Sequence, residues 1–247
     1  MASLKTTVLS AMICLFAFSA VAAPSAAGGW GDFLKDVQKA LSGEESITEA
    51  DIIQGLKEAL TIGAANAIEK VSTINGYYKN PKIKIPLPER VQKVEKLLRG
   101  AGYGAQVDSF ELSMNRAAEK AAPKAKTLFW DAIKGMTFSD ANKILKGREN
   151  EATLYFKGKT FDRLQEIFKP IVHKAMSQAG VTRRFQDLNA KLKKTPFAER
   201  LSFDLDQYVT EQALDGLFLM LAEEEAKIRR DPAARVTDLL KRVFGNL

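Results

Sequence analysis

The sequence predicts an all-α protein, a single-domain bundle of about eight to ten helices with one extended, proline-rich strap between helices. Apolar residues recur at spacings of three and four along most of the chain, which is the pattern of a helix with one buried face. No alternation of apolar and polar residues runs beyond about five positions, so no strand is expected. Hydrophobic residues make up 46% of the 247 positions, which is enough for a core.

The first 22 residues have the features of a cleaved signal peptide. A short start with Lys5 precedes an apolar run over residues 8–18, and Ala20-Val21-Ala22 fits the small-x-small cleavage pattern. The apolar run is shorter than the ~20 residues that a bilayer span needs. We therefore expect an exported, periplasmic protein without a transmembrane segment in the mature chain, with a flexible leader at 23–29 and a single helical domain at 30–247.

Cys14 is the only cysteine of the chain. Ile13 precedes it, whereas lipoprotein processing requires a small residue there, so lipidation is not expected. Cleavage after Ala22 removes Cys14, and the mature chain is then predicted to lack disulfides, thiol catalysis and thiolate metal sites.

The first half of the predicted domain reads as a series of short and medium helices. An apolar stripe predicts a helix over residues 30–41. Thr48, followed three residues later by Asp51, predicts a capping box for a second helix that continues to Val71. Small residues at Gly63-Ala64-Ala65 would let another helix approach closely. Helical spacing returns over residues 91–98, 106–117, 128–136 and 139–145, the last stretch with Ser139 as its expected cap.

The second half predicts longer helices. Residues 150–179 read as one short and one long helix, and Pro170 is expected to kink the long one. A basic amphipathic helix over 183–194 and an irregular link follow. Residues 205–230 form the most hydrophobic pattern of the chain and are predicted to be the central core helix. A last amphipathic helix is expected over 236–244.

The strap is the stretch "YYKNPKIKIPLP", residues 77–88. Three of its residues precede prolines, which disfavours helix, so residues 80–87 are predicted to be extended. Their alternation would turn Ile83, Ile85 and Leu87 toward the helices and Lys82 and Lys84 toward solvent. The strap is either structural or, if its outer edge is open, a docking surface formed by Tyr77, Tyr78, Lys82 and Lys84. The stretch 200–205 is the one internal candidate to pair with it.

The chain has a net charge of +7, or +6 without Lys5. In an exported protein this excess does not point to nucleic acid. It confers solubility, or it attracts an anionic lipid, an anionic polymer or an acidic envelope protein. The clearest basic patch surrounds the helix at 183–194 and comprises Arg183, Arg184, Lys191, Lys193 and Lys194.

The chemistry available to the chain is limited, because it has one histidine. A single histidine excludes a multi-histidine zinc site, and no phosphate-binding loop, metalloprotease helix or calcium loop is present. We predict no metal and no cofactor. His173 shares a helical face with charged residues, so an exposed histidine is favoured over a catalytic base.

Asp215 is the acid that stands out, because its neighbours in "ALDGLFLML" are apolar and predict its burial. A buried carboxylate is either a structural anchor or an acid with a tuned pKa. Glu211 and Tyr208 lie on the same helical line. The nearby pairs Glu223/Lys227 and Glu225/Arg229 have the spacing of surface ion pairs.

A second polar set is formed by Asn115, Arg116 and Glu119. Asn115 and Glu119 are one helical turn apart among alanines that permit close helix packing. A hydrogen-bond network between helices is the simpler interpretation, and a binding site is the alternative.

Four blocks of the sequence together resemble a known family: "NPKIKIPLPERVQKVEKLLR", "ELSMNRAAEKAAPKAK", "DAIKGMTFSDANKIL" and the stretch from Tyr208 to Gly245. They are similar to the exported bacterial proteins of domain-of-unknown-function family 4197, over roughly residues 46–245. The resemblance implies an all-α, periplasmic protein of a Gram-negative bacterium. It carries over no catalytic or binding residue.

Three functions from different classes remain open. A non-catalytic binding or interaction protein of the cell envelope is favoured by the missing catalytic constellation. A helical carrier of an apolar ligand such as a lipid requires an internal cavity. A carboxylate-based envelope hydrolase requires two acids at one cleft, with Asp215 and Glu119 as the candidates.

Overall fold

The computed structural model describes residues 48–178, 180 and 204–230. The chain divides into two compact units, Met1–Ser46 and Ile47–Leu247, and the described residues belong to the second. Several predictions fall outside the described residues. They concern the signal peptide, the leader, the helix at 30–41, the basic helix at 183–194 with its patch, the link before residue 204 and the helix at 236–244.

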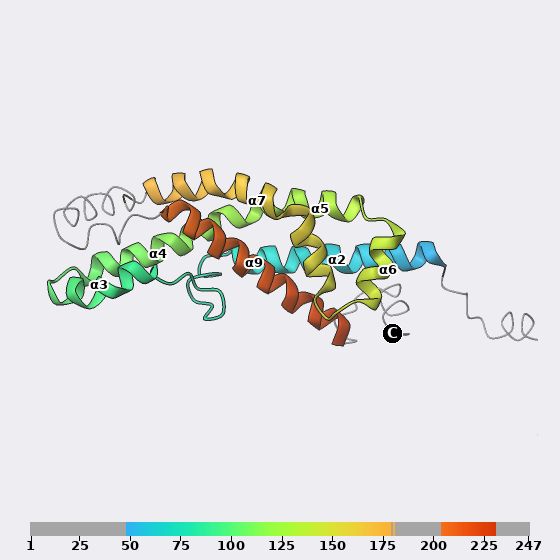
Figure 1. Cartoon of the computed structure of the whole chain (residues 1–247), viewed down its shortest axis with the longest axis horizontal. Helices are drawn as coiled ribbons and strands as arrows, with labels where there is room; N and C mark the ends of the chain where they lie inside the picture. Colours follow the sequence, from blue (N-terminus) through green and yellow to red (C-terminus); the bar gives the residue numbers. More distant parts are fainter. Residues whose placement is uncertain (1–47, 179, 181–203, 231–247) are drawn as a thin grey trace, which may run out of the picture. The chain divides into compact units, whose positions relative to one another are not determined.

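The described residues are helical, with no strand among them, and the all-α prediction is confirmed (Figure 1). The whole chain was expected to hold about eight to ten helices, and the described part contains seven α-helices and one 3-10 turn. They are α2 (Glu49–Ser72), α3 (Glu89–Gly100), α4 (Gly104–Ala121), η1 (Ala122–Lys124), α5 (Ala125–Lys134), α6 (Phe138–Lys146), α7 (Glu151–Gln178) and α9 (Leu205–Arg230).

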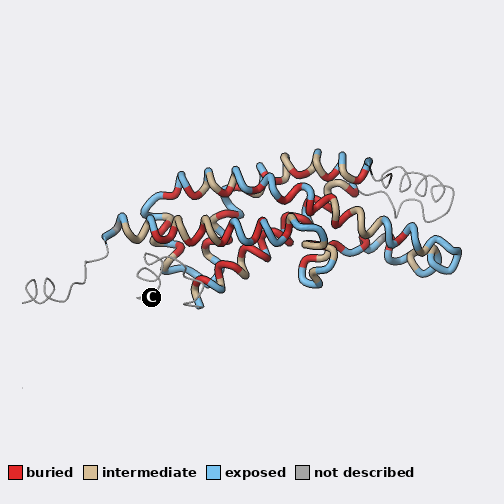
Figure 2. The backbone as a smooth tube through the Cα atoms, turned by 180° about the vertical axis from the view of Figure 1, so that it is seen from behind, coloured by how far each residue is buried: buried red, intermediate tan, exposed pale blue. Residues whose placement is uncertain are grey.

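Helix α9 is the centre of the packing. It contacts α2, α4 and α7, and half of its residues are buried. The buried stretches of these four helices form one connected core (Figure 2). The prediction that residues 205–230 form the core helix is therefore confirmed. Among the described residues, no helix combines the length and the hydropathy needed to cross a bilayer.

Two helices begin with capping boxes, in which side chains satisfy the free amides of the first turn. At α2 the Asp51 amide donates to Thr48 Oγ1 (3.1 Å) and the Thr48 amide donates to Asp51 Oδ2 (2.9 Å), as predicted. At α6 the cap is Thr137 with Asp140, two residues before the predicted Ser139. Thr137 is the cap because Asp140 lies three residues after it and completes the capping box.

Helix α7 runs without interruption from Glu151 to Gln178, so the predicted division into a short and a long helix was wrong. Pro170 lies inside it. A proline removes one backbone hydrogen bond and strains the preceding turn. The cost is offset by packing of the opposite face of α7, because Pro170 is exposed whereas Phe168 and Val172 are fully buried.

Gly63 marks the close approach of α2 and α9 that the small residues predicted. A Cβ atom built on Gly63 would lie 3.4 Å from Ile228 Cδ1 and 3.7 Å from Glu224 Cβ, both on α9. These are ordinary van der Waals distances to side-chain atoms, so α9 packs directly on this face of α2 and an alanine would also fit at residue 63. The contact places Glu224 against the middle of α2.

The strap joins α2 to α3 and differs from the prediction in its first half. Residues 80–83 form a turn, in which the Ile83 and Lys84 amides donate to the Asn80 carbonyl (3.2 and 2.8 Å). Asparagine followed by proline favours the first two positions of a turn, and Asn80 Oδ1 also accepts from the Lys82 amide (3.1 Å). Residues 84–88 carry no regular structure. The predicted facing is nevertheless observed, since Ile83, Ile85 and Leu87 are buried.

Candidate functional site

Asn115 fastens the strap to α4. Its side-chain Oδ1 accepts a hydrogen bond from the Ile85 amide (2.8 Å), and its Nδ2 donates to the Ile85 carbonyl (2.9 Å). Nδ2 also donates to the Glu111 carbonyl one turn earlier (2.9 Å). The side-chain amide of Asn115 thus satisfies both the N–H and the C=O of Ile85, as the backbone of a neighbouring β-strand would.

Glu119 holds the beginning of the strap. Its Oε1 accepts from the amides of Tyr77 (3.1 Å) and Tyr78 (3.3 Å). Its Oε2 accepts from Arg116 Nη1 (2.5 Å), and the same guanidinium donates through Nη2 to Asn75 Oδ1 (2.9 Å). The polar set predicted on α4 is therefore a network, but its partner is the strap and the turn before it rather than another helix.

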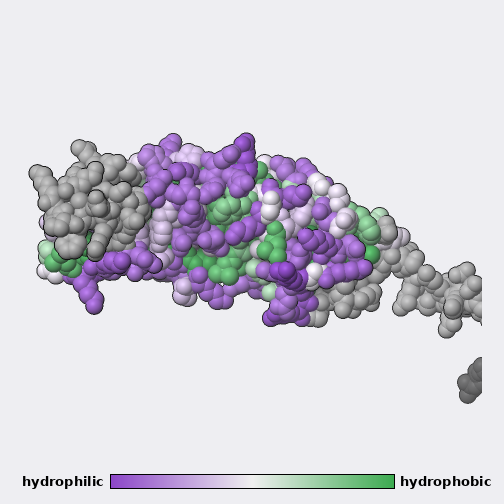
Figure 3. Space-filling view, viewed as in Figure 1, coloured by the Kyte–Doolittle hydropathy of each residue, from purple (hydrophilic) through white to green (hydrophobic). Residues whose placement is uncertain are grey.

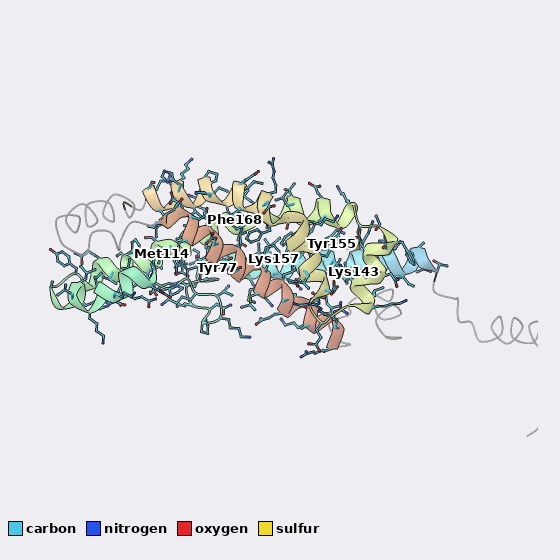
Figure 4. The ribbon with its side chains drawn as sticks, viewed as in Figure 1. Tyr77, Met114, Lys143, Tyr155, Lys157 and Phe168 are labelled. Atoms are coloured by element: carbon cyan, nitrogen blue, oxygen red, sulfur yellow. The ribbon has the colours of Figure 1, made fainter. Side chains whose placement is uncertain are left out.

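Tyr77 anchors the strap from the other side. Its ring is fully buried, and its hydroxyl donates to the Ala213 carbonyl of α9 (2.6 Å). Burial, together with the nearby charge of Glu119, raises the pKa of the Tyr77 hydroxyl. Tyr77 lies where the strap, α4 and α9 meet, because its amide reaches Glu119 and its hydroxyl reaches Ala213 (Figure 4). A fully buried Tyr77 offers no surface for docking.

Gly216 on α9 makes room for that ring, which predicts a measurable effect of Gly216→Ala. The added Cβ would lie 2.7 Å from Tyr77 Cε1 and 3.1 Å from Ile83 Cβ. Overpacking of this kind costs about 1–3 kcal/mol, against a gain of about 1 kcal/mol in helix propensity. We expect a net loss of unfolding free energy of up to about 2 kcal/mol in denaturant titrations.

The matched control is Gly158→Ala. Gly158 is exposed on α7, and a Cβ there meets nothing within 4 Å. This variant is expected to gain about 0.5–1 kcal/mol from helix propensity alone. Equal stabilisation by both substitutions would contradict the packing of Tyr77 against α9.

The remaining strap candidates lie on the outer side and are engaged with the helices. Lys82 pairs with Glu223 of α9 (2.6 Å) and Lys84 with Glu111 of α4 (2.8 Å). The Lys84 ammonium also lies 5.0 Å from the ring centroid of Tyr78, which is half-buried. Tyr208 of α9 donates to the Pro86 carbonyl (3.1 Å). The strap is thus fastened along its length to α4 and α9.

Asp215 is exposed, so the prediction of its burial was wrong. Its side chain is 61% accessible and lies 3.7 Å from Lys157 of α7. The prediction relied on the apolar residues next to Asp215 in sequence. On a helix, however, adjacent residues point in different directions, so apolar neighbours do not imply burial. Asp215 shares its helical line with Glu211 and Leu219, and all three are exposed. Glu119 and Asp215 each have a basic partner, and neither lines the groove described below.

Glu224 is a buried carboxylate that the sequence reasoning did not select. Its Oε1 accepts hydrogen bonds from both Lys70 of α2 and Lys227 (2.8 Å for the latter), and its Oε2 accepts from Asn66 (3.2 Å). Burial alone would raise the pKa of the Glu224 carboxyl, but the bonds from Lys227, Lys70 and Asn66 outweigh it and hold that pKa below its ordinary value. Two ammonium groups therefore share one carboxylate oxygen.

A lowered folded-state pKa makes Glu224 a source of acid sensitivity. Its contribution to stability is fully present above the unfolded pKa of about 4.3 and is lost as the pH falls through the folded pKa. We expect the unfolding free energy to decline below about pH 5, with a shallower decline in Glu224→Gln. Denaturant titrations from pH 3 to 7 measure both slopes. Two parallel curves would show that the pKa of Glu224 does not differ between the folded and the unfolded protein.

Glu225, the next residue, is buried as well and caps α7. Its carboxylate accepts from the amides of Ala152 (3.0 Å) and Thr153 (2.9 Å) and from the Thr153 hydroxyl (2.9 Å). The predicted pair with Arg229 is present at 2.9 Å, but it is not a surface pair, because Arg229 is only 16% exposed. The other predicted pair is replaced, since Lys227 bonds Glu224 and Glu223 bonds Lys82.

An open groove of about 560 Å³ lies beside the strap, at the carboxyl end of α2. We call it the polar groove. Its lining comes from three elements and comprises Asn66, Glu69, Lys70, Thr73, Asn80 and Met220. Five of these six side chains are polar, which differs from the apolar cavity that a lipid carrier needs. Asn80 donates weakly to Met220 Sδ (3.6 Å), which ties the strap to the α9 wall of the groove.

His173 is exposed on α7, as predicted, and its Nδ1 lies 2.7 Å from Asp206 Oδ2 at the start of α9. Beside it Lys169 bonds Asp204 (2.8 Å), which raises the pKa of the lysine and lowers that of the aspartate. Within the described residues, no three histidine, aspartate or glutamate side chains are grouped as a metal site requires.

One face of the molecule is mostly polar. Figure 3 shows polar side chains over most of one face and a smaller apolar area near its middle. Exposed apolar side chains on the neighbouring helices include Leu154 of α7 (40% exposed) and Leu219 of α9 (43% exposed). This face therefore offers polar chemistry more widely than apolar contact.

The fold and the groove together define an all-α helical protein without a recognisable catalytic constellation in its described part. A family model described as "Protein of unknown function (DUF4197)" matches residues 46–245. The chain belongs to this family, which confirms the resemblance seen in the sequence. No curated protein matches the chain. No solved structure matches it either.

Proposed function

We propose that this protein is a non-catalytic binding or interaction protein of the bacterial cell envelope, located in the periplasm, and that its ligand binds in the polar groove. The observation that carries the proposal is that one set of polar side chains holds the strap, while a second set lines the open groove. Asn115, Arg116 and Glu119 are engaged in holding the strap. The polar side chains of the groove beside the strap line a wall that is open to solvent.

Two features weigh against the alternatives. A hydrolase of the carboxylate type needs two acids across one cleft, whereas Asp215 is exposed beside Lys157 and Glu119 is buried against the strap. A carrier of an apolar ligand needs an apolar cavity, whereas five of the six side chains that line the polar groove end in an amide, a hydroxyl or a charged group. Binding of a polar ligand fits this lining best.

Site-specific photo-crosslinking in living cells tests the proposal. A photoreactive residue at Thr73, which lines the groove, is expected to capture a ligand or partner from the envelope. The control position is Lys134 of α5, whose carbonyl accepts from Lys57 in the other half of α2. Equal capture at both positions, or none at Thr73, would contradict the proposal.

The periplasmic location rests on the amino-terminal sequence and has its own test. We expect the protein recovered from the periplasmic fraction to begin at Ala23, because Ala20 and Ala22 fit signal peptidase cleavage. Intact-mass spectrometry of that fraction measures the start. A replacement of Ala22 by lysine should block processing and leave the chain membrane-associated. A cytoplasmic protein that still begins with Met1 would refute the proposed location.

A further inference from the structure

We infer that the polar groove recognises a small zwitterion, whose anionic group binds at Lys70 and whose ammonium group binds at Glu69. The inference rests on the proposed function, since it gives the chemical class of the ligand for the same groove. It starts from two groove residues that are adjacent in sequence and opposite in charge. Both lie in the last two turns of α2 and both line the groove.

Lys70 provides the anion-binding side. Its ammonium donates to Glu224, which Lys227 also contacts, so two positive charges converge on one buried negative charge. An ammonium has three donors, and Glu224 occupies one of those of Lys70. The side chain of Lys70 is 43% exposed. Donors therefore remain for a carboxylate or a phosphate on the open side.

Glu69 provides the cation-binding side. It is exposed, and it forms no ion pair among the described residues. It lies in the last turn of α2, where the negative end of the helix dipole also favours a positive group. Thr73 Oγ1, which donates to the Lys70 carbonyl, keeps lone pairs that can accept a hydrogen bond.

The balance of charge selects a zwitterion over a simple ion. A purely anionic ligand would meet the unpaired carboxylate of Glu69, and a purely cationic ligand would meet the ammonium of Lys70. A ligand with both groups can pair with both charged side chains of α2. Asn80 and Met220 close the groove opposite α2, where an amide and a thioether suit a short polar or carbon chain between the two charges. The volume of about 560 Å³ lies in the range of small-molecule sites.

Two sources share this chemistry, a free short peptide and the headgroup of an ethanolamine phospholipid. The probes are the dipeptide alanyl-alanine, the same dipeptide with both ends blocked, and vesicles with or without phosphatidylethanolamine. The protein is purified after export from cells that express the full chain. Binding is measured by amide chemical shifts and by calorimetry for the dipeptides, and by flotation for the vesicles.

We expect the free dipeptide to shift the amides of α2 and Asn80, or the ethanolamine vesicles to retain the protein. Either result supports the inference and identifies the source. Lys70→Gln and Glu69→Gln should each weaken binding at least about fivefold, roughly 1 kcal/mol. Lys227→Gln is the matched control, because it also removes an ammonium from Glu224 but leaves the groove lining intact. It should change binding less than about twofold.

Three results would overturn the inference: equal binding of the blocked and the free dipeptide, equal loss in Lys70→Gln and Lys227→Gln, or no binding of either probe. Crosslinking at Thr73 separates these failures from failure of the proposed function. If Thr73 captures a ligand that lacks one of the two charges, the groove is a binding site and only the zwitterion assignment is wrong.

Discussion

Replacing Glu225 by alanine is expected to lower the unfolding free energy by about 3–5 kcal/mol, the largest effect of any single change considered for this protein. The carboxylate is buried and receives the first free amides of α7 as well as Arg229. Its removal leaves the amides of Ala152 and Thr153 without an acceptor in the core. It also leaves the guanidinium of Arg229 without its carboxylate partner. Denaturant titration with unchanged m-value measures the loss.

Glu223→Ala is the control for this experiment. Glu223 lies two residues earlier on the same helix and pairs with Lys82, but that lysine is 63% exposed. A surface pair contributes about 0–1 kcal/mol, so little change is expected. Glu225→Gln should fall between the two, because the amide keeps one acceptor oxygen. A similar loss in Glu223→Ala and Glu225→Ala would show that Glu225 does not cap α7.

The second large effect is expected for Asn115→Ala, which should lower the unfolding free energy by about 2–4 kcal/mol. The change leaves the amide and the carbonyl of Ile85 without their hydrogen-bond partners. Ile85 is buried, so water cannot replace the lost partners without opening the contact between the strap and α4. Hydrogen exchange should show faster exchange of the Ile85 amide together with the loss of global stability.

Asn115→Asp and Ser113→Ala sharpen this test. Aspartate keeps the acceptor for the Ile85 amide but lacks the donor to its carbonyl and adds a buried charge, so it should destabilise at least as much as alanine. Ser113, on the same helix, donates only to the Ser109 carbonyl one turn earlier, and its replacement by alanine should be nearly neutral. If Asn115→Ala matched Ser113→Ala, the strap would not depend on Asn115.

The acids of α9 show why site prediction from this sequence failed in part. Asp215 was predicted to be buried because the letters beside it are apolar, yet burial on a helix follows the line of every third or fourth residue. Leu217, Leu221 and Ile228 are buried, and Glu224 falls on that line. The phase of the apolar stripe would have identified Glu224, while the local composition pointed to Asp215.

The strap shows a different limit. The order of prolines excluded helix and the alternation placed Ile83, Ile85 and Leu87 inward, and both hold in the structure. The acceptor for each strap amide could not be read from the sequence. Asn115 and Glu119 lie 30 residues or more away along the chain, and the distance between them and the strap depends on how α4 packs.

The sequence by itself determined the all-α class, the capping box of α2, the core role of residues 205–230 and the family, because periodicity, caps and long matching blocks are local properties of the chain. Only the tertiary structure decided that Glu224 bonds Lys70 and Asn66, that Glu225 caps α7, that α4 holds the strap and that α2, the strap and α9 line a groove. These features join residues from separate helices, and their contacts exist only once those helices have packed.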